Sequence, residues 1–234
     1  MLILLLFRKN RDSMKLFVEA VIKYLVGLII VMFLLFIPAG TIYFYNGWLF
    51  IWLLFFPMFI VGIVMLIKDP HLLKSRLDVR EKETVQKEVI VYSGIMFILG
   101  FLVAGLNYRF KWIVLPNIVI IISTIVFIIS YILYGVVLKT NTYLSRSIKV
   151  VDNQKVIDNG LYGVVRHPMY MITIILFLTI PLILGSIISF GIFLIYPFII
   201  VKRIKNEEIV LERELKGYKE YEKKVRYRLI PFIW

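Results

Sequence analysis

The chain contains no cysteine and only two histidines among its 234 residues. Without cysteine there is no disulfide framework, thiol nucleophile or thiolate metal site, and two histidines are too few for a histidine-rich metal cluster. Charged residues are scarce as well, at 18% of the chain, and they are nearly absent from several long apolar runs. The sequence therefore predicts a protein without a metal centre.

Apolar side chains dominate instead, because 61% of the residues are hydrophobic and 15% are aromatic, far above an ordinary soluble domain. Several runs are about as long as the roughly 20 apolar residues that cross a bilayer. A further apolar region is too long for one straight helix and contains Pro181, Gly185 and Pro197, so it predicts two short helices joined near Leu184, Gly185 and Ser186. The four long runs are residues 16–39, 48–67, 89–106 and 112–138, and the interrupted region is residues 169–201.

These runs predict an all-α integral membrane protein with four long transmembrane helices, a C-terminal helical hairpin and a cytoplasmic C-terminal helix over residues 202–228. No glycine-rich G-x-G-x-x-G turn follows a strand pattern, so we expect no Rossmann domain. We divide the chain into an N-terminal transmembrane region, residues 1–138, and a ligand-binding region, residues 139–234. A stripe that includes Ile204, Leu211 and Tyr218 is expected to lie against the membrane surface or the rest of the protein.

Lysine and arginine orient the chain, because the successive segments between the runs carry 4, 0, 6, 2, 5 and 10 of them. This alternation follows the positive-inside rule and predicts a cytoplasmic N-terminus, a cytoplasmic tail and a hairpin tip on the opposite side. The net charge of +13 thus reports orientation, and we expect no nucleic-acid partner. The lack of cysteine and of long extensions favours a prokaryotic plasma membrane.

The first residues, "MLILLLF", are apolar but lack the charged-then-apolar order and the small-residue cleavage site of a signal peptide. We expect either a peripheral anchor or an extended start upstream of Met14.

Polar residues gather just before the hairpin, in "GLYGVVRHPMY", residues 160–170. Pro168 is suited to the first position of a helix, with His167 at the cap and Arg166 just outside. Free backbone N–H groups, the helix dipole and the guanidinium together predict an anion site for a carboxylate or a phosphate, and the dipole favours a neutral His167. The alternative is that Arg166 and His167 reach lipid headgroups and Pro168 only starts a helix.

A second polar cluster follows the hairpin, in "RIKNEEIVLEREL", residues 203–215. Arg203 and Glu207 are four residues apart and share a helix face, although arginine before glutamate is the weaker order for an ion pair. Glu207 and Glu208 stand where the helix leaves the membrane within a basic tail, and they are suited to a cationic or hydroxyl-rich ligand. The alternative is a surface ion pair of little energetic value.

Together the two clusters resemble the isoprenylcysteine carboxyl methyltransferase family, whose C-terminal half is similar to that of phospholipid methyltransferases. The resemblance covers residues 154–232 and consists of G-x-Y, R-H-P-x-Y, R-x-x-x-E-E, Gly-Tyr-x-x-Tyr and I-P-F in a fixed order. It implies S-adenosylmethionine as methyl donor, bound without a Rossmann domain, and a lipid or lipidated acceptor that enters from the bilayer.

The resemblance also assigns residues. Arg203 is implied to bind the acceptor carboxylate, and Glu207 the cofactor. From the chemistry of the ligands we add Arg166 for the cofactor carboxylate, and His167 and Glu208 as the proton acceptors that an amine acceptor requires. We therefore expect His167 and Arg203 in catalysis, and Arg203 and Glu208 at the acceptor. At the cofactor, Arg166 joins the residues that the resemblance implies, which are Gln154, Lys155, Val156, Ile157, Tyr162, His167, Pro168, Met169, Tyr170 and Glu207.

The sequence thus favours an S-adenosylmethionine-dependent membrane methyltransferase that methylates a carboxylate oxygen. Three other functions stay open. One is N-methylation of a phospholipid amine, and a second is NADPH-dependent reduction, since membrane sterol-type reductases carry a similar R-H-P-x-Y pattern. The third is a small transporter, which would place polar residues at mid-span, where this chain has few.

Overall fold

The computed structural model describes residues 11–78, 84–144, 150 and 153–234, and every regular element among them is helical, with no strand in those ranges. Within these ranges, five helices are long and apolar enough to cross a membrane. The predicted all-α membrane fold is therefore confirmed, whereas the expectation for residues 1–7 lies outside the described residues. The helices, including one 3₁₀ turn (η1), are α2 (Arg11–Ala39), α3 (Tyr45–Lys68), α4 (Pro70–Leu77), α5 (Thr84–Phe110), α6 (Asn117–Thr140), η1 (Gly160–Gly163), α7 (Pro168–Ile183), α8 (Ile187–Phe193), α9 (Tyr196–Glu214) and α10 (Tyr218–Lys224).

The four predicted long spans correspond to α2, α3, α5 and α6, each of 24 to 29 residues. At a rise of 1.5 Å per residue these helices exceed the ~30 Å thickness of the hydrocarbon core. The fourth span begins at Asn117 and not near Trp112, because Pro116 has extended backbone angles at the cap position and lacks the N–H that a continuing helix would use.

The C-terminal hairpin turns where the sequence predicted, between Ile183 and Ile187. Gly185 has a φ of +77°, a conformation that glycine adopts without steric cost, and the Ser186 hydroxyl caps α8 by accepting a hydrogen bond from the Ser189 amide at 3.2 Å. Pro181 does not break the first arm, since it lies only two residues before the end of α7.

The predicted single tail helix over residues 202–228 is wrong. The return arm of the hairpin runs from the membrane directly into α9, and the chain then bends at Gly217, whose φ is +88°. This left-handed residue ends one helix and starts α10 in a new direction. The bend folds Tyr218 and Val225 into a buried cluster with Leu215 and with Val156, so the predicted apolar stripe packs on the rest of the protein.

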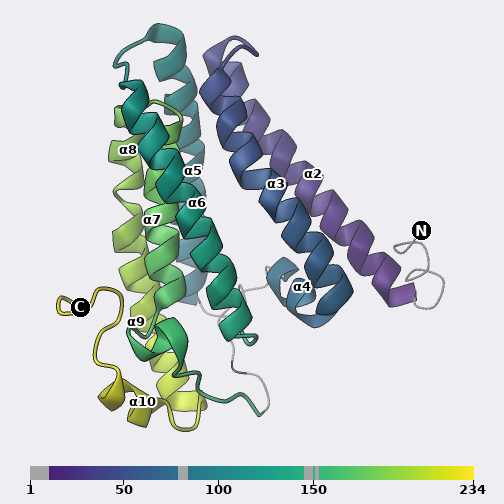
Figure 1. Ribbon diagram of the computed structural model, residues 1–234, viewed down its shortest axis with the longest axis vertical. Coiled ribbons are helices and arrows are strands. Elements are labelled where there is room, and N and C mark those ends of the chain that lie inside the picture. Colours follow the sequence, from purple (N-terminus) through teal and green to yellow (C-terminus); the bar gives the residue numbers. More distant parts are fainter. Residues whose placement is uncertain (1–10, 79–83, 145–149, 151–152) are drawn as a thin grey trace.

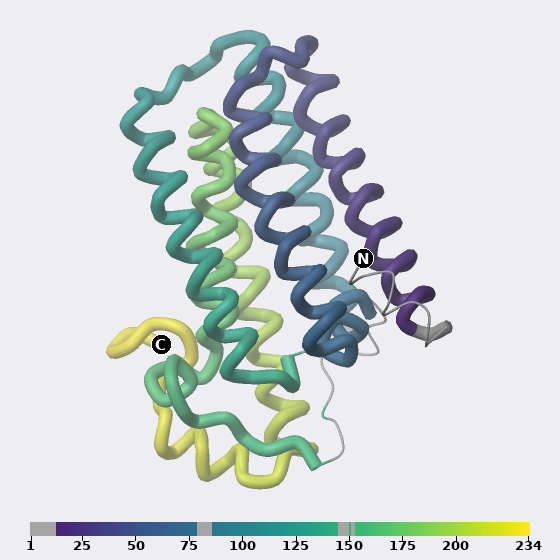
Figure 2. The backbone as a smooth tube through the Cα atoms, turned by 45° about the vertical axis from the view of Figure 1, so that its right-hand side comes forward, coloured from purple at the N-terminus to yellow at the C-terminus, as the bar shows by residue number. Residues whose placement is uncertain are grey.

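The helices form a bundle in which α6 packs along α7, and α5 packs against α2, α8 and α9 (Figure 1). The loops after α2 and α5 and the hairpin turn lie at one end, and α4, the segment before the hairpin and the tail lie at the other (Figure 2). The segments that alternate in lysine and arginine content therefore separate to opposite ends. That the basic end faces the cytoplasm stays a prediction.

Close packing of α5 on α8 requires a glycine, which leads to a test. A Cβ atom built on Gly100 would lie 2.3 Å from Cε2 of Phe193, whereas one built on Gly94 of the same helix would meet nothing within 4 Å. We expect Gly100→Ala to lower the free energy of unfolding by about 1–3 kcal/mol, as in overpacked cores, and Gly94→Ala to leave it unchanged or raise it. Reversible unfolding of the purified protein in mixed micelles measures both, and equal effects of the two substitutions would contradict the predicted packing.

Candidate active site

A pocket lies at the basic end of the bundle, where segments that are distant in sequence meet. Residues 154–157 form one side, and the bent tail covers them through the Leu215 and Tyr218 cluster. The beginning of α7 and the middle of α9 supply the remaining walls. The lining residues are Asn141, Tyr143, Leu144, Gln154, Lys155, Val156, Ile157, Tyr162, His167, Met169, Tyr170, Arg203, Glu207, Leu211, Leu215, Tyr218 and Tyr221.

The start of α7 has the predicted cap, with Pro168 in its first turn and His167 at the cap position. The expected set of free backbone N–H groups is smaller than predicted, however. The His167 amide donates to the Arg228 carbonyl at 2.9 Å, and the Tyr170 amide donates to the His167 carbonyl at 3.1 Å. The helix start is therefore held by the C-terminal strip, and less of it is left to bind an anion.

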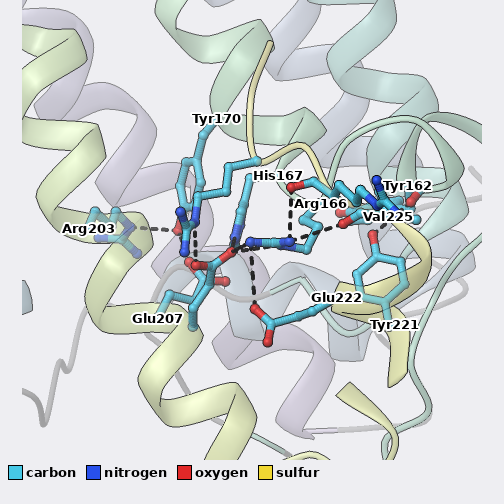
Figure 3. A network of polar contacts seen from close by, with 12 residues as sticks. Tyr162, Arg166, His167, Tyr170, Arg203, Glu207, Tyr221, Glu222 and Val225 are labelled. Atoms are coloured by element: carbon cyan, nitrogen blue, oxygen red, sulfur yellow. Dashed lines mark hydrogen bonds and ion pairs between the residues drawn. The ribbon is translucent and has the colours of Figure 1, made fainter. Parts of the chain in front are cut away.

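Tyr170, Arg203 and Glu207 form a chain of hydrogen bonds across the pocket (Figure 3). The Arg203 Nε atom donates to the Tyr170 hydroxyl at 2.8 Å, and that hydroxyl donates to Oε2 of Glu207. The Arg203 guanidinium carbon also lies 5.6 Å from the centroid of the Tyr170 ring, a cation–π distance. The two strips on either side of the hairpin thus converge on one pocket, as the sequence predicted.

Arg166 and Glu208 are not among the lining residues, because they form a separate buried ionic cluster beside the pocket. The exposed fractions are 8% for Arg166 and 3% for Glu208. Arg166 donates from Nε to Oε1 of Glu208 at 2.8 Å, and its Nη1 atom donates to the Val225 and Arg226 carbonyls at 3.0 and 3.2 Å. The Arg228 Nε atom donates to the other Glu208 oxygen at 2.6 Å.

This cluster corrects two sequence expectations. Arg166 is not positioned to hold a ligand carboxylate, since its guanidinium already bonds Glu208 and two tail carbonyls. Glu208 is not exposed to an acceptor, since two arginines and His167 surround it, with 3.2 Å between His167 Nε2 and Oε1. The physical reason is that a buried carboxylate requires countercharges and hydrogen bonds, and the tail supplies them. Both residues fasten the C-terminal strip to the start of α7.

Of the other predicted site residues, all but Pro168 line the pocket. Pro168 is buried in the first turn of α7 and does not line the pocket. That the lining residues bind a cofactor or an acceptor stays a prediction. The sequence-predicted residues that do line the pocket are Gln154, Lys155, Val156, Ile157, Tyr162, His167, Met169, Tyr170, Arg203 and Glu207.

Sequence reasoning missed Tyr218 and Tyr221 as lining residues, although it noted the Gly-Tyr-x-x-Tyr motif that contains them. The Tyr221 hydroxyl donates to the Tyr162 carbonyl at 2.7 Å. The hydroxyls of Tyr162 and Tyr218 are buried and have no hydrogen-bond partner in the described part of the chain. Burial raises the pKa of both phenols well above the usual value, so both hydroxyls stay protonated at neutral pH and are donors for a ligand.

Comparison with known proteins gives two findings. Residues 118–213 match the family model described as "Isoprenylcysteine carboxyl methyltransferase (ICMT) family". A segment of 91 residues, 38% of this chain, is 28% identical to the Delta(14)-sterol reductase of Mus musculus and covers 22% of that protein. The match thus covers about a fifth of the length of this curated relative.

Proposed function

We propose that this chain, whose residues 118–213 match the model of the isoprenylcysteine carboxyl methyltransferase family, transfers a methyl group from S-adenosylmethionine to a lipid-like acceptor. The observation that carries the proposal is the convergence of Tyr170, Arg203 and Glu207, from both sides of the hairpin, on one pocket. The acceptor group that fits best is a carboxylate, and the proposed site is at the cytoplasmic face.

The pocket residues suit the parts of the cofactor. Glu207 is an anionic partner for the ammonium or the ribose hydroxyls, and Tyr162 and Tyr218 offer unpaired hydroxyl donors. Aromatic faces attract a cationic sulfonium, and Tyr170 presents one. The cavity volume of about 90 Å³ is less than the ~300 Å³ or more of a small-molecule site. Binding therefore requires the Arg203, Tyr170 and Glu207 side chains to separate.

Arg203 is the proposed ligand for the acceptor carboxylate. Arg203 lies on α9, in the arm that returns from the hairpin, and lines the pocket. A planar guanidinium binds a carboxylate through two parallel hydrogen bonds, which fixes the orientation of the oxygen that is to be methylated. Exchange of the Tyr170 hydroxyl for the acceptor would release Tyr170 and Glu207 for the cofactor.

Methyl transfer to a carboxylate requires mainly that the protein align the acceptor oxygen with the methyl group of the donor. When bound, S-adenosylmethionine supplies an electrophilic methyl carbon on a positively charged sulfur. A carboxylate is ionised at neutral pH and requires no general base, so the contribution of the chain is to align the reactants and exclude water. In this account Arg203 orients the acceptor, Glu207 and the tyrosines hold the donor, and His167 supports the Tyr170 ring, whose centroid is 5.7 Å away.

The match to a sterol reductase supports a second candidate, which is hydride transfer from NADPH. The lining of the pocket favours the methyl donor, because NADPH carries several phosphate charges and the pocket combines Lys155 and Arg203 with the carboxylate of Glu207. Methylation of a phospholipid amine is a third candidate. It requires a proton acceptor, and the imidazole of His167 is the group in the pocket suited to that role.

Calorimetry of the detergent-purified protein against S-adenosylhomocysteine and NADPH separates the first two candidates. We expect S-adenosylhomocysteine to bind and NADPH to release no heat. Binding of NADPH alone would favour the reductase, and binding of neither ligand would contradict both enzyme proposals.

A further inference from the structure

Arg76 lies at the basic end of the bundle on α4, an element that the sequence did not predict. The Asp69 side chain caps this helix by accepting a hydrogen bond from the Leu72 amide at 3.0 Å, and Pro70 begins it. Leu72 and Leu73 are buried, so α4 is anchored beneath α2 and α3. The helix therefore holds Arg76 in a fixed place beside the membrane-spanning helices.

The Arg76 guanidinium reaches across to α6. Its Nη2 atom donates to the Tyr134 hydroxyl, and its carbon lies 5.7 Å from the centroid of the Tyr134 ring. The Nη1 atom of Arg76 is buried and has no hydrogen-bond partner in the described part of the chain. Arg166 offers a contrast, since carbonyl and carboxylate oxygens occupy its guanidinium. A buried, unpaired N–H of a charged group is costly and is best satisfied by an anion.

Arg76 is also near the proposed active site. Tyr134 packs in a cluster with Val137, Ile172 and the pocket residue Tyr162. Burial is the main cause of the raised pKa of the Tyr162 phenol, and the positive charge of Arg76 opposes that rise. Arg76 is therefore near enough to interact electrostatically with Tyr162. The guanidinium thus lies close to Tyr162, which lines the pocket.

The contact between Arg76 and Tyr134 joins α4, which packs against α2 and α3, to α6. Higher in the bundle α3 and α6 touch, because the Tyr131 hydroxyl donates to the Leu54 carbonyl at 3.3 Å. One turn further along α6, Tyr134 contacts Arg76 of α4, whose helix lies near the ends of α3 and α6 (Figure 1). An amphiphile in the bilayer would place its head at Arg76 and its tail along exposed apolar residues of these helices, such as Val64 of α3 and Ile132 of α6.

We propose that Arg76 binds the anionic head, a carboxylate or a phosphate, of an amphiphilic acceptor and selects anionic amphiphiles over neutral ones. This inference rests on the proposed function for the identity of the ligand as an acceptor. The unpaired Nη1 atom and the Nη2 atom that Tyr134 now holds form one edge of the guanidinium, and such an edge matches two oxygens of a carboxylate or phosphate. Arg203 then holds the group that reacts, and Arg76 determines which amphiphiles reach it.

The test measures binding without any methyl donor. Palmitate, hexadecyl phosphate and hexadecanol are titrated separately into the protein in a neutral maltoside detergent, and thermophoresis reports the affinities. We expect at least one of the two anions to bind more tightly than hexadecanol, and the pair shows whether carboxylate or phosphate is preferred. Arg76→Gln should weaken that anion by about tenfold or more, as for loss of a charged hydrogen bond, and leave hexadecanol unchanged.

Lys74→Gln is the matched control, because it removes an exposed positive charge from the same helix, and it should bind the anions as the unaltered protein does. Unchanged anion affinity in Arg76→Gln, or an equal loss for hexadecanol, would overturn the inference. Should Arg76→Gln fail to fold, Arg76→Lys keeps the charge and should still prefer an anion to hexadecanol; loss of that preference in folded protein overturns it as well. Binding of S-adenosylhomocysteine should be the same in all variants, so failure of the donor site is visible separately.

Discussion

Replacement of Glu207 with glutamine is expected to lower the affinity for S-adenosylhomocysteine by about a hundredfold while the protein stays folded. The substitution keeps the shape of the side chain and an oxygen that accepts from Tyr170, but it removes the negative charge that faces the proposed ammonium or ribose. Hydrogen bonds to charged groups contribute about 1.5–3 kcal/mol each, and 1.4 kcal/mol is a factor of ten.

Calorimetry with the purified variant measures this loss. Glu212→Gln is the control, because Glu212 is exposed on α9 and does not line the pocket, and the substitution removes the same charge from the same helix. The control should bind as the unaltered protein does. Equal affinity of Glu207→Gln and Glu212→Gln for the ligand would remove Glu207 from the proposed site.

Replacement of Glu208 with alanine is expected to destabilise the protein by about 3–5 kcal/mol, the range for breaking a buried ion pair by removal of one partner. Glu208 is only 3% exposed and receives hydrogen bonds from Arg166 at 2.8 Å and Arg228 at 2.6 Å. Without the carboxylate, the buried Arg166 guanidinium keeps its positive charge and is left with the more distant Glu222 carboxylate, at 3.6 Å. The tail and the start of α7 would then lose the cluster that joins them.

Unfolding by sodium dodecyl sulfate in mixed micelles gives the free energy, and Glu212→Ala is the comparison because it removes an exposed glutamate from the same helix. We expect the comparison variant to unfold within about 0.5 kcal/mol of the unaltered protein. A Glu208→Ala protein with unchanged stability would show that Arg166 and Arg228 hold the tail without this carboxylate.

The order of the spans and the position of the hairpin turn could be predicted because they depend on local properties. Bilayer thickness fixes the length of an apolar helix, and Gly185 and Ser186 interrupt the last run with residues that turn and cap a chain. The convergence of Tyr170 and Glu207 was also within reach, because a short hairpin returns both of its ends to the same side of the membrane.

The partners of the charged residues were beyond local reasoning. Arg166 precedes Glu208 by 42 residues and Val225 by 59. The sequence therefore showed no sign of these partners, and the guanidinium was expected to bind a ligand, although in the fold it bonds the Glu208 carboxylate and the Val225 carbonyl. The bend at Gly217 was missed because a seven-residue repeat continued through it, and the repeat describes spacing and not backbone conformation. Conversely, Arg76 entered the sequence analysis only through the charge count of its loop, and it is α4 that brings Arg76 against Tyr134.

The central claim is that the two strips beside the hairpin form one pocket for methyl transfer to a carboxylate. Incubation of the protein, in membranes of the host that produced it, with S-adenosylmethionine labelled in the methyl group tests this claim most directly. The account predicts label in the lipid-soluble fraction that mild base releases as volatile methanol, as from a methyl ester, and that Arg203→Gln abolishes. Label that resists base would indicate methylation of an amine, and the absence of any transferred label from a protein that binds NADPH would contradict the account.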